Sequence, residues 1–268
     1  MEMQTLLSFD TAWRATVLLL AANQALSSLE LLSKGDIFED EGILGRRLAM
    51  LRSAWMLRRP MRVILWNLWE PRTFRGILLA RLALALAVAL FPTQTVPLAT
   101  LAAVNLFVSL RLPSGRDGAD QMSEIALTAL TLGAFGGDSA RMLSVWFVAV
   151  QGILSYVVAG FAKAAAKGWW SGGYLRGILS TTSYGDIRAL NVFRRYPLLS
   201  TAASVGVIVF ECTFWAVLVL PPKAAVAFLV LGFLFHAANA AVMGLNNFVW
   251  AFIATYPCIL VLRAALAH

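Results

Sequence analysis

The stretch at residues 142–163, "MLSVWFVAVQGILSYVVAGFAK", decides the fold class of this chain. Residues 142–162 carry no charged side chain, and Lys163 ends the run. A helix needs about 20 mostly apolar residues to cross the hydrocarbon core of a bilayer. The stretch therefore predicts a transmembrane helix that ends close to Lys163.

The composition extends this prediction to the whole chain. Of the 268 residues, 60% are hydrophobic and only 13% are charged, which is far from the balance of a soluble globular protein. The net charge of +8 comes from basic residues in short loops between apolar segments, so we attribute it to membrane topology and expect no nucleic-acid partner. Cys212 and Cys258 have no second cysteine or histidine at ligand spacing, so no disulfide framework or metal site is expected.

Apolar segments of uneven strength recur along the sequence, of which 123–135 is short and the weakest, and they are separated mostly by short turns rich in proline and glycine. They predict an all-α fold: a polytopic membrane helical bundle of about eight transmembrane helices, forming a single domain over residues 1–268. The segments lie at residues 12–32, 74–91, 95–110, 123–135, 142–162, 200–220, 224–242 and 248–267.

Two longer connections are basic and aromatic. Residues 45–72 carry many arginines interspersed with Trp55, Trp66 and Trp69, a pattern that predicts a helix lying in the membrane interface with aromatic rings at headgroup depth. Residues 164–199 have a similar character. Placing both connections in the cytoplasm gathers most of the Lys and Arg residues on that side, as the positive-inside rule requires.

Few ionisable residues lie deep within the apolar segments, where such a side chain is costly and is a functional candidate; Glu211 and His236 are two of them. Glu211 lies in the middle of "TAASVGVIVFECTFWAVLVL"; it is either a site residue or a structural partner of Arg14 or Arg81. His236 has Asn239 three residues later, which places both on one face of a helix. The pair forms either a polar pocket or an ordinary interhelical hydrogen bond.

Charged residues at the ends of apolar segments have simpler explanations. Lys163, followed by Trp169 and Trp170, has the composition of an interfacial anchor. Asp117 and Asp120 precede the segment 123–135, where aspartate caps the free amides of a helix and complements its dipole. Composition alone favours both of these structural explanations.

The order of several stretches changes this interpretation for Lys163. In order they are "WRATVLLLAANQ", "FEDEGILG", "RLPSGRDGADQM", "SYVVAGFAKAAAKGWWSGGYLRGIL", "VIVFECTFWAVLVLP" and "FLFHAANAAVMGLNNFVWAFIATYP". Together they resemble the HTTM family, the transmembrane module of vitamin K-dependent gamma-glutamyl carboxylases and their bacterial relatives. The most specific matches are "AG-x-x-K", which ends at Lys163, and "FH-x-x-N", which contains His236 and Asn239.

The resemblance implies roles for five residues. Lys163 occupies the position of the base that acts on vitamin K hydroquinone, and only a neutral amine can accept that proton. In the carboxylases the quinol anion then reacts with oxygen, and the strong base that results deprotonates a glutamyl side chain for carboxylation by CO2. His236 and Asn239 match residues that hydrogen-bond quinone or substrate oxygens, Glu211 matches an acidic position of the bacterial relatives, and Asp120 is a further candidate for binding the quinone.

The sequence also departs from the carboxylases. They carry an Asn-His pair near the start of the helix that corresponds to residues 123–135, where this chain reads "GADQMSEI". The cofactor expected from the resemblance is reduced vitamin K or menaquinol, without a metal. We expect Lys163, Glu211, His236 and Asn239 to converge in one buried cavity that is accessible from the lipid.

Two functions remain open from the sequence. The first is a quinol-coupled enzyme of the bacterial cytoplasmic membrane, carboxylase-like or epoxidase-like, that modifies a peptide. The alternative is a non-catalytic membrane subunit, scaffold, or immunity or maturation partner for a secreted peptide, in which Lys163 is only an anchor. The expected partners are the lipid bilayer and either a peptide substrate or a second membrane subunit. A transporter is disfavoured because we find no inverted repeats or paired broken helices.

Overall fold

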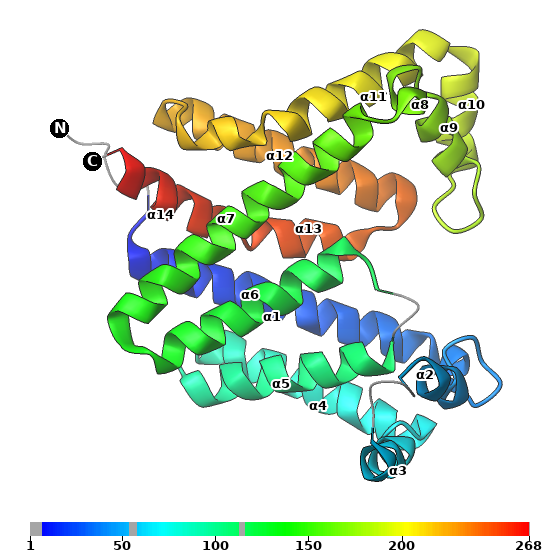
Figure 1. Ribbon diagram of the computed structural model, residues 1–268, viewed down its shortest axis with the longest axis vertical. Helices are drawn as coiled ribbons and strands as arrows, with labels where there is room; N and C mark the ends of the chain where they lie inside the picture. The colour runs from blue at the N-terminus through cyan, green and yellow to red at the C-terminus, as the bar shows by residue number, and fades with distance from the viewer. Residues whose placement is uncertain (1–6, 54–57, 113–115, 268) are drawn as a thin grey trace. The chain divides into compact units, whose positions relative to one another are not determined.

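The computed structural model describes residues 7–53, 58–112 and 116–267, and every regular element in these ranges is a helix (Figure 1). The predicted all-α class is therefore confirmed. The elements are α1 (Phe9–Ser33), η1 (Gly35–Phe38), α2 (Arg46–Ser53), α3 (Arg59–Leu68), α4 (Pro71–Leu90), α5 (Thr95–Arg111), α6 (Gly118–Phe135), α7 (Gly137–Ala164), α8 (Lys167–Trp170), α9 (Gly173–Leu179), α10 (Ile187–Arg195), α11 (Pro197–Cys212), η2 (Phe214–Leu218), α12 (Pro222–Met243), α13 (Asn246–Ile253) and α14 (Tyr256–Leu266).

Five helical stretches in the described residues are long and apolar enough to cross a membrane. They are α1, α4, α7, α12 and the stretch Asn246–Leu266, which joins α13 and α14. The apolar helices α5 and α11 are shorter, with 17 and 16 residues, and α11 gives way to η2 after Cys212. The helices are those of an integral membrane protein, but the predicted count of about eight spans is not confirmed.

The chain divides into two compact units. The N-terminal unit is Trp13–Ser144, and the C-terminal unit is Val145–His268 together with Met1–Ala12. The boundaries between them fall inside α1 and α7, so both long helices contribute residues to each unit. The single domain over residues 1–268 stays a prediction.

In the N-terminal unit, α5 packs against both α4 and α6. Asp117 caps α6: its side chain accepts hydrogen bonds from the amides of Ala119 at 2.9 Å and Asp120 at 3.0 Å, while the Asp120 carboxylate accepts one from the Asp117 amide at 3.3 Å. This reciprocal capping box confirms the capping role predicted for both aspartates. Glu70 caps α4 with a single bond, which its carboxylate accepts from the Thr73 amide at 2.9 Å, and this bond lowers the pKa of the Glu70 carboxyl.

The basic segment predicted to lie in the interface contains two helices, α2 and α3. Trp66 is 37% exposed, and the Arg46 guanidinium lies over its ring at 4.3 Å, as an interfacial tryptophan would allow. Trp69 differs from the prediction: it is fully buried in a core with Phe38 and Phe74. Trp55 lies outside the described residues. The exposure of Trp66 is compatible with the predicted interfacial position and the burial of Trp69 is not; that the segment lies in the membrane interface stays a prediction.

In the C-terminal unit, the short helices α8, α9 and α10 gather near the end of α7, and α12 packs against α13 (Figure 1). Ser200 at the start of α11 ties this region together. Its hydroxyl donates to the Gly172 carbonyl at 2.9 Å and accepts from the Arg176 guanidinium at 3.0 Å. These bonds hold α8 and α9 against α11, so that Trp169 at the end of α8 has a defined place.

Gly172 makes this close approach possible. Its φ of +66° is in the left-handed region, which a residue with a side chain adopts only at a cost. A Cβ atom at this position would also meet the backbone carbonyl of Ser200 at 2.7 Å. Both constraints require glycine here.

We expect Gly172→Ala to lower the free energy of unfolding by about 1 to 3 kcal/mol, because it combines a strained φ with a steric clash. Thermal unfolding of the protein in detergent micelles measures the change. Gly177→Ala on α9 is the matched control, since a Cβ there meets nothing within 4 Å and alanine is the better helix former. Equal stability of the two variants would contradict the role given to Gly172.

Candidate functional site

A cavity of about 290 Å³ lies within the C-terminal unit. Its wall is mostly apolar and aromatic, and four of its polar side chains are those selected from the sequence: Lys163 of α7, Glu211 of α11, and His236 and Asn239 of α12. We call it the Lys163 cavity. Its volume approaches the range of small-molecule sites, which are typically apolar with a few placed polar groups. The structure thus brings together four of the five candidate residues.

Lys163 and Glu211 form an ion pair. The Lys163 Nζ lies 2.9 Å from Glu211 Oε1 and 2.7 Å from Oε2, and the two side chains are 21% and 5% exposed. The ammonium group also lies 5.5 Å from the centre of the Trp169 ring. The partner of Glu211 is therefore Lys163, and the pairing with Arg14 or Arg81 considered from the sequence is wrong.

This geometry also bears on the anchor interpretation of Lys163. An interfacial anchor directs its ammonium group toward water and lipid headgroups, whereas this ammonium group is held by a buried carboxylate on a neighbouring helix. Lys167 at the start of α8 is exposed, and no salt bridge to it is formed among the described residues. Lys167 fits the description of a plain anchor better than Lys163 does.

A close contact between α7 and α11 explains why a glycine, Gly160, lies three residues before Lys163. A Cβ atom on Gly160 would lie 2.6 Å from the Cys212 amide nitrogen and 2.9 Å from the Glu211 carbonyl carbon. The backbones of α7 and α11 therefore touch one turn before Lys163, as small residues allow in membrane helix pairs. This contact brings the Lys163 and Glu211 side chains within hydrogen-bonding distance.

His236 is fixed by two tyrosines that the sequence analysis missed. The Tyr156 hydroxyl lies 2.7 Å from His236 Nε2 and 2.8 Å from the Tyr256 hydroxyl. The His236 ring is 2% exposed and stacks on Phe252 at 4.5 Å between ring centres. A tyrosine in an apolar segment has the same sequence signal as any buried aromatic residue, so only the fold reveals this hydroxyl chain.

Two polar groups of the cavity wall lack partners within the described residues. His236 Nδ1 is buried without a hydrogen bond, and the Asn239 side chain forms no hydrogen bond to any residue in ranges 7–53, 58–112 and 116–267. His236 and Asn239 lie on one face of α12, as predicted, but they do not bond to each other. Buried polar groups are normally paired, so His236 Nδ1 is a candidate for contact with a ligand. Asn239 is only half-buried, and its place in the cavity wall makes it a second candidate.

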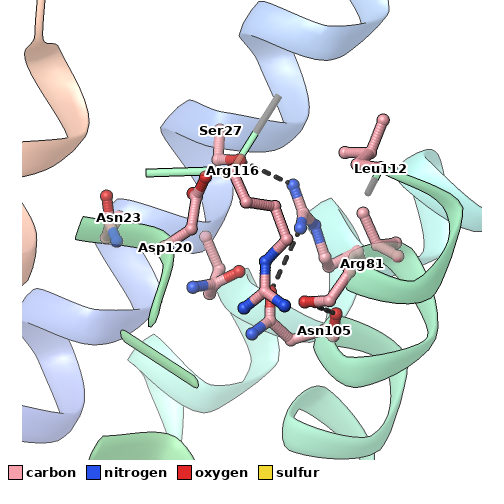
Figure 2. A pocket seen from close by; sticks show the side chains of 10 residues that line it. Asn23, Ser27, Arg81, Asn105, Leu112, Arg116 and Asp120 are labelled. Atoms are coloured by element: carbon pink, nitrogen blue, oxygen red, sulfur yellow. Dashed lines mark hydrogen bonds between the residues drawn. The ribbon is translucent and has the colours of Figure 1, made fainter. Parts of the chain in front are cut away.

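Asp120, the fifth candidate, does not line the Lys163 cavity. It belongs to the N-terminal unit and lines a separate cavity there (Figure 2). That cavity holds about 30 Å³, roughly the volume of one water molecule, and is too small for a quinone ring. The capping bonds between Asp120 and Asp117 give Asp120 a structural role at the start of α6.

Arg81 is the buried charge of this smaller cavity (Figure 2). Its guanidinium donates to Ser28 Oγ at 2.8 Å, Ser27 Oγ at 2.9 Å and Asn105 Oδ1 at 3.3 Å. These bonds tie α4 to α1 and α5. We interpret the cluster as a polar connection that joins helices of the N-terminal unit.

Comparisons with protein-family models, curated proteins and solved structures found no match for this chain. Its long apolar helices are those of an integral membrane protein. The C-terminal unit of this protein contains a mostly apolar cavity with a few polar side chains in its wall. Membership of the HTTM family stays a prediction that rests on the order of the sequence motifs.

We expect Gly160→Ala to separate α7 from α11 and to cost about 1 to 3 kcal/mol of stability, as overpacking does. Gly206→Ala on α11 is the matched control, because a Cβ there meets nothing within 4 Å. Unfolding in detergent compares both variants with the parent protein.

A double-mutant cycle with Glu211→Gln then shows whether the effect of Gly160 passes through the ion pair. If it does, the second substitution adds less to the first than it costs alone, because the pair is already disturbed. Strict additivity would mean that Gly160 and the ion pair are independent.

Proposed function

We propose that the protein is an HTTM-type membrane protein that binds a hydroquinone of the menaquinol or vitamin K class in the Lys163 cavity and accepts a proton from it at Lys163. The observation that supports the proposal is that Lys163, Glu211, His236 and Asn239, chosen from the sequence, line one mostly apolar cavity. The expected location is the cytoplasmic membrane of a bacterium.

The cavity wall suits a flat ring with oxygen atoms at its edge. Phe235, Phe248, Phe252 and Trp169 offer aromatic faces against which a ring system stacks. The unpartnered His236 Nδ1 and the Asn239 amide are groups that a ring oxygen could pair with. A hydroquinone would supply the acidic hydroxyl group and the reducing electrons of the reaction.

The Lys163–Glu211 pair is arranged to exchange a proton. As an ammonium group Lys163 cannot act as a base, but its Nζ lies only 2.7 Å from Glu211 Oε2, so that its proton can move to the carboxylate. The amine left behind is neutral and accepts a proton from a hydroxyl group in the cavity. Glu211 thus holds the first proton while Lys163 takes the second.

The overall reaction proposed is a quinol-coupled modification, carboxylase-like or epoxidase-like, with a peptide as the substrate. This part of the proposal rests on the resemblance of "AG-x-x-K" and "FH-x-x-N" to the family pattern. A non-catalytic subunit, scaffold or peptide-maturation partner is the second candidate. The two close contacts of the Lys163 Nζ with both oxygens of Glu211 favour this second candidate, because such an ion pair can join α7 to α11 without taking part in any reaction.

We expect Lys163→Ala to reduce the consumption of reduced menaquinone by about 100-fold or more, as the loss of a general base does. The assay follows the oxidation of the quinol by dissolved oxygen, which accepts its two electrons, as a change in absorbance with protein in lipid nanodiscs, corrected for empty nanodiscs. Lys167→Ala is the matched control, because it removes an exposed lysine only four residues further along the chain. This variant should retain the parent rate. Quinone binding is measured in parallel as a rise in thermal stability with ligand concentration.

The outcomes separate the two candidates. Parent protein that binds the quinone but does not consume quinol would remove the catalytic role of Lys163 and keep the binding site. Parent protein that neither binds nor consumes it would favour the scaffold. Equal loss of turnover in both lysine variants would show that positive charge, and not the base, is what matters.

A further inference from the structure

The Tyr256 hydroxyl, the Tyr156 hydroxyl and His236 form a chain of hydrogen bonds. The number of hydrogens in this chain limits the directions in which its hydrogen bonds can run. Each tyrosine hydroxyl has one hydrogen to donate, and a neutral imidazole carries one hydrogen on either Nδ1 or Nε2. The His236 ring is buried and no described carboxylate is bonded to it, so a charged ring would be costly. Two directions of the chain are therefore available.

In the first direction, Tyr256 donates to Tyr156 and Tyr156 donates to His236 Nε2. Both hydroxyl hydrogens are then paired across the 2.8 and 2.7 Å contacts, and the ring hydrogen is on Nδ1. Only one group, Nδ1–H, remains without a partner among the described residues.

In the second direction, His236 Nε2–H donates to Tyr156 and Tyr156 donates to Tyr256. The Tyr256 hydroxyl hydrogen then has no acceptor in the described part of the chain, although Tyr256 is only 8% exposed. His236 Nδ1, now an acceptor, is unpaired as well. This direction leaves two buried groups unpaired instead of one, and each such group costs about 1 to 3 kcal/mol.

We infer that the Tyr256–Tyr156 hydroxyl chain holds His236 in the tautomer with its hydrogen on Nδ1, so that His236 offers a hydrogen-bond donor and selects ligands with an acceptor oxygen, such as the oxygen of a quinone or hydroquinone. The part about the ligand rests on the proposed quinone site. Because Nδ1 is itself buried, the ligand oxygen must displace the side chains that cover it.

Gly232 supports the placement of the chain. It lies on α12 one turn before His236, and a Cβ atom at Gly232 would collide with the Tyr256 hydroxyl. The hydroxyl group therefore packs directly against the backbone of α12, the helix that carries His236. Tyr156 is held from another side, where its ring stacks on Phe214 at 3.7 Å between ring centres.

Two polar regions of the cavity wall then differ in what they offer a ligand. His236 donates a hydrogen bond, whereas the Lys163–Glu211 pair accepts a proton in the proposed reaction. A hydroquinone matches both, because one of its oxygens accepts a hydrogen bond from His236 while the hydroxyl group on the other side gives up its proton. Tyr156 and Tyr256 are positioning residues in this scheme, since they act through His236.

The test is the ¹⁵N NMR spectrum of the full chain, labelled on histidine and placed in nanodiscs. The sequence contains only two histidines, so in the His268→Ala variant every histidine signal comes from His236. We expect a protonated Nδ1 and an unprotonated Nε2 before any ligand is added. A protonated Nε2, or a doubly protonated ring, would overturn the inference.

Two tyrosine variants test the cause. Tyr256→Phe should keep the hydrogen on Nδ1, because Tyr156 then has His236 Nε2 as its only acceptor. Tyr156→Phe keeps the stacked ring but removes the bond to Nε2, so both tautomers should appear. A spectrum unchanged by Tyr156→Phe would show that the hydroxyl chain does not set the tautomer.

Menadione and 2-methylnaphthalene, the same ring without oxygens, test the ligand class. We expect menadione to shift the Nδ1 signal and to bind the parent protein at least about tenfold more tightly than the hydrocarbon, which corresponds to one hydrogen bond. The difference should shrink in Tyr156→Phe. A protonated Nδ1 with no response to menadione would refute the ligand selection and the proposed quinone site while leaving the tautomer assignment intact.

Discussion

The ion pair between Lys163 and Glu211 is the interaction on which the site depends. It joins α7 to α11 inside the C-terminal unit, with its nitrogen less than 3 Å from both carboxylate oxygens. Removing one partner of such a pair leaves a buried charge uncompensated, at a cost of about 3 to 5 kcal/mol. The contact is possible only because Gly160 and the backbone of Glu211 and Cys212 touch. A small residue on one helix thus determines the position of a charge on another.

The cavity beside the pair has two polar regions with different physical characters. In the proposed reaction, the proton of the ion pair moves over the short distance between nitrogen and oxygen. In the inferred arrangement, the tyrosines and His236 form a neutral chain whose direction is set by the need to pair each hydroxyl hydrogen. The wall around both regions is mostly apolar and aromatic. These features make the cavity suited to a ring with oxygen atoms.

The sequence predicted much of the site because costly residues are conspicuous in apolar segments. Glu211 and His236 stood out for that reason, Asn239 was selected by its helical spacing from His236, and the order of motifs added Lys163. Tyr156 and Tyr256 were not selected, because a hydrophobicity pattern does not distinguish a bonded tyrosine from any other buried aromatic residue. Asp120 lies outside the Lys163 cavity, and its contacts are those of a helix cap. Trp69 was taken for an interfacial residue, whereas it packs in a core with Phe38 and Phe74.

By itself the sequence determined the helices, because apolar runs in lipid must satisfy their backbone hydrogen bonds internally and a helix does so within one segment. It also determined which residues are costly to bury. Only the tertiary structure decided that Glu211 meets Lys163 and not an arginine, that α1 and α7 are shared between two units, and that two tyrosine hydroxyl groups form a chain with His236. These contacts join residues that are 48 to 100 positions apart in the chain, and local patterns carry no information about which helices become neighbours.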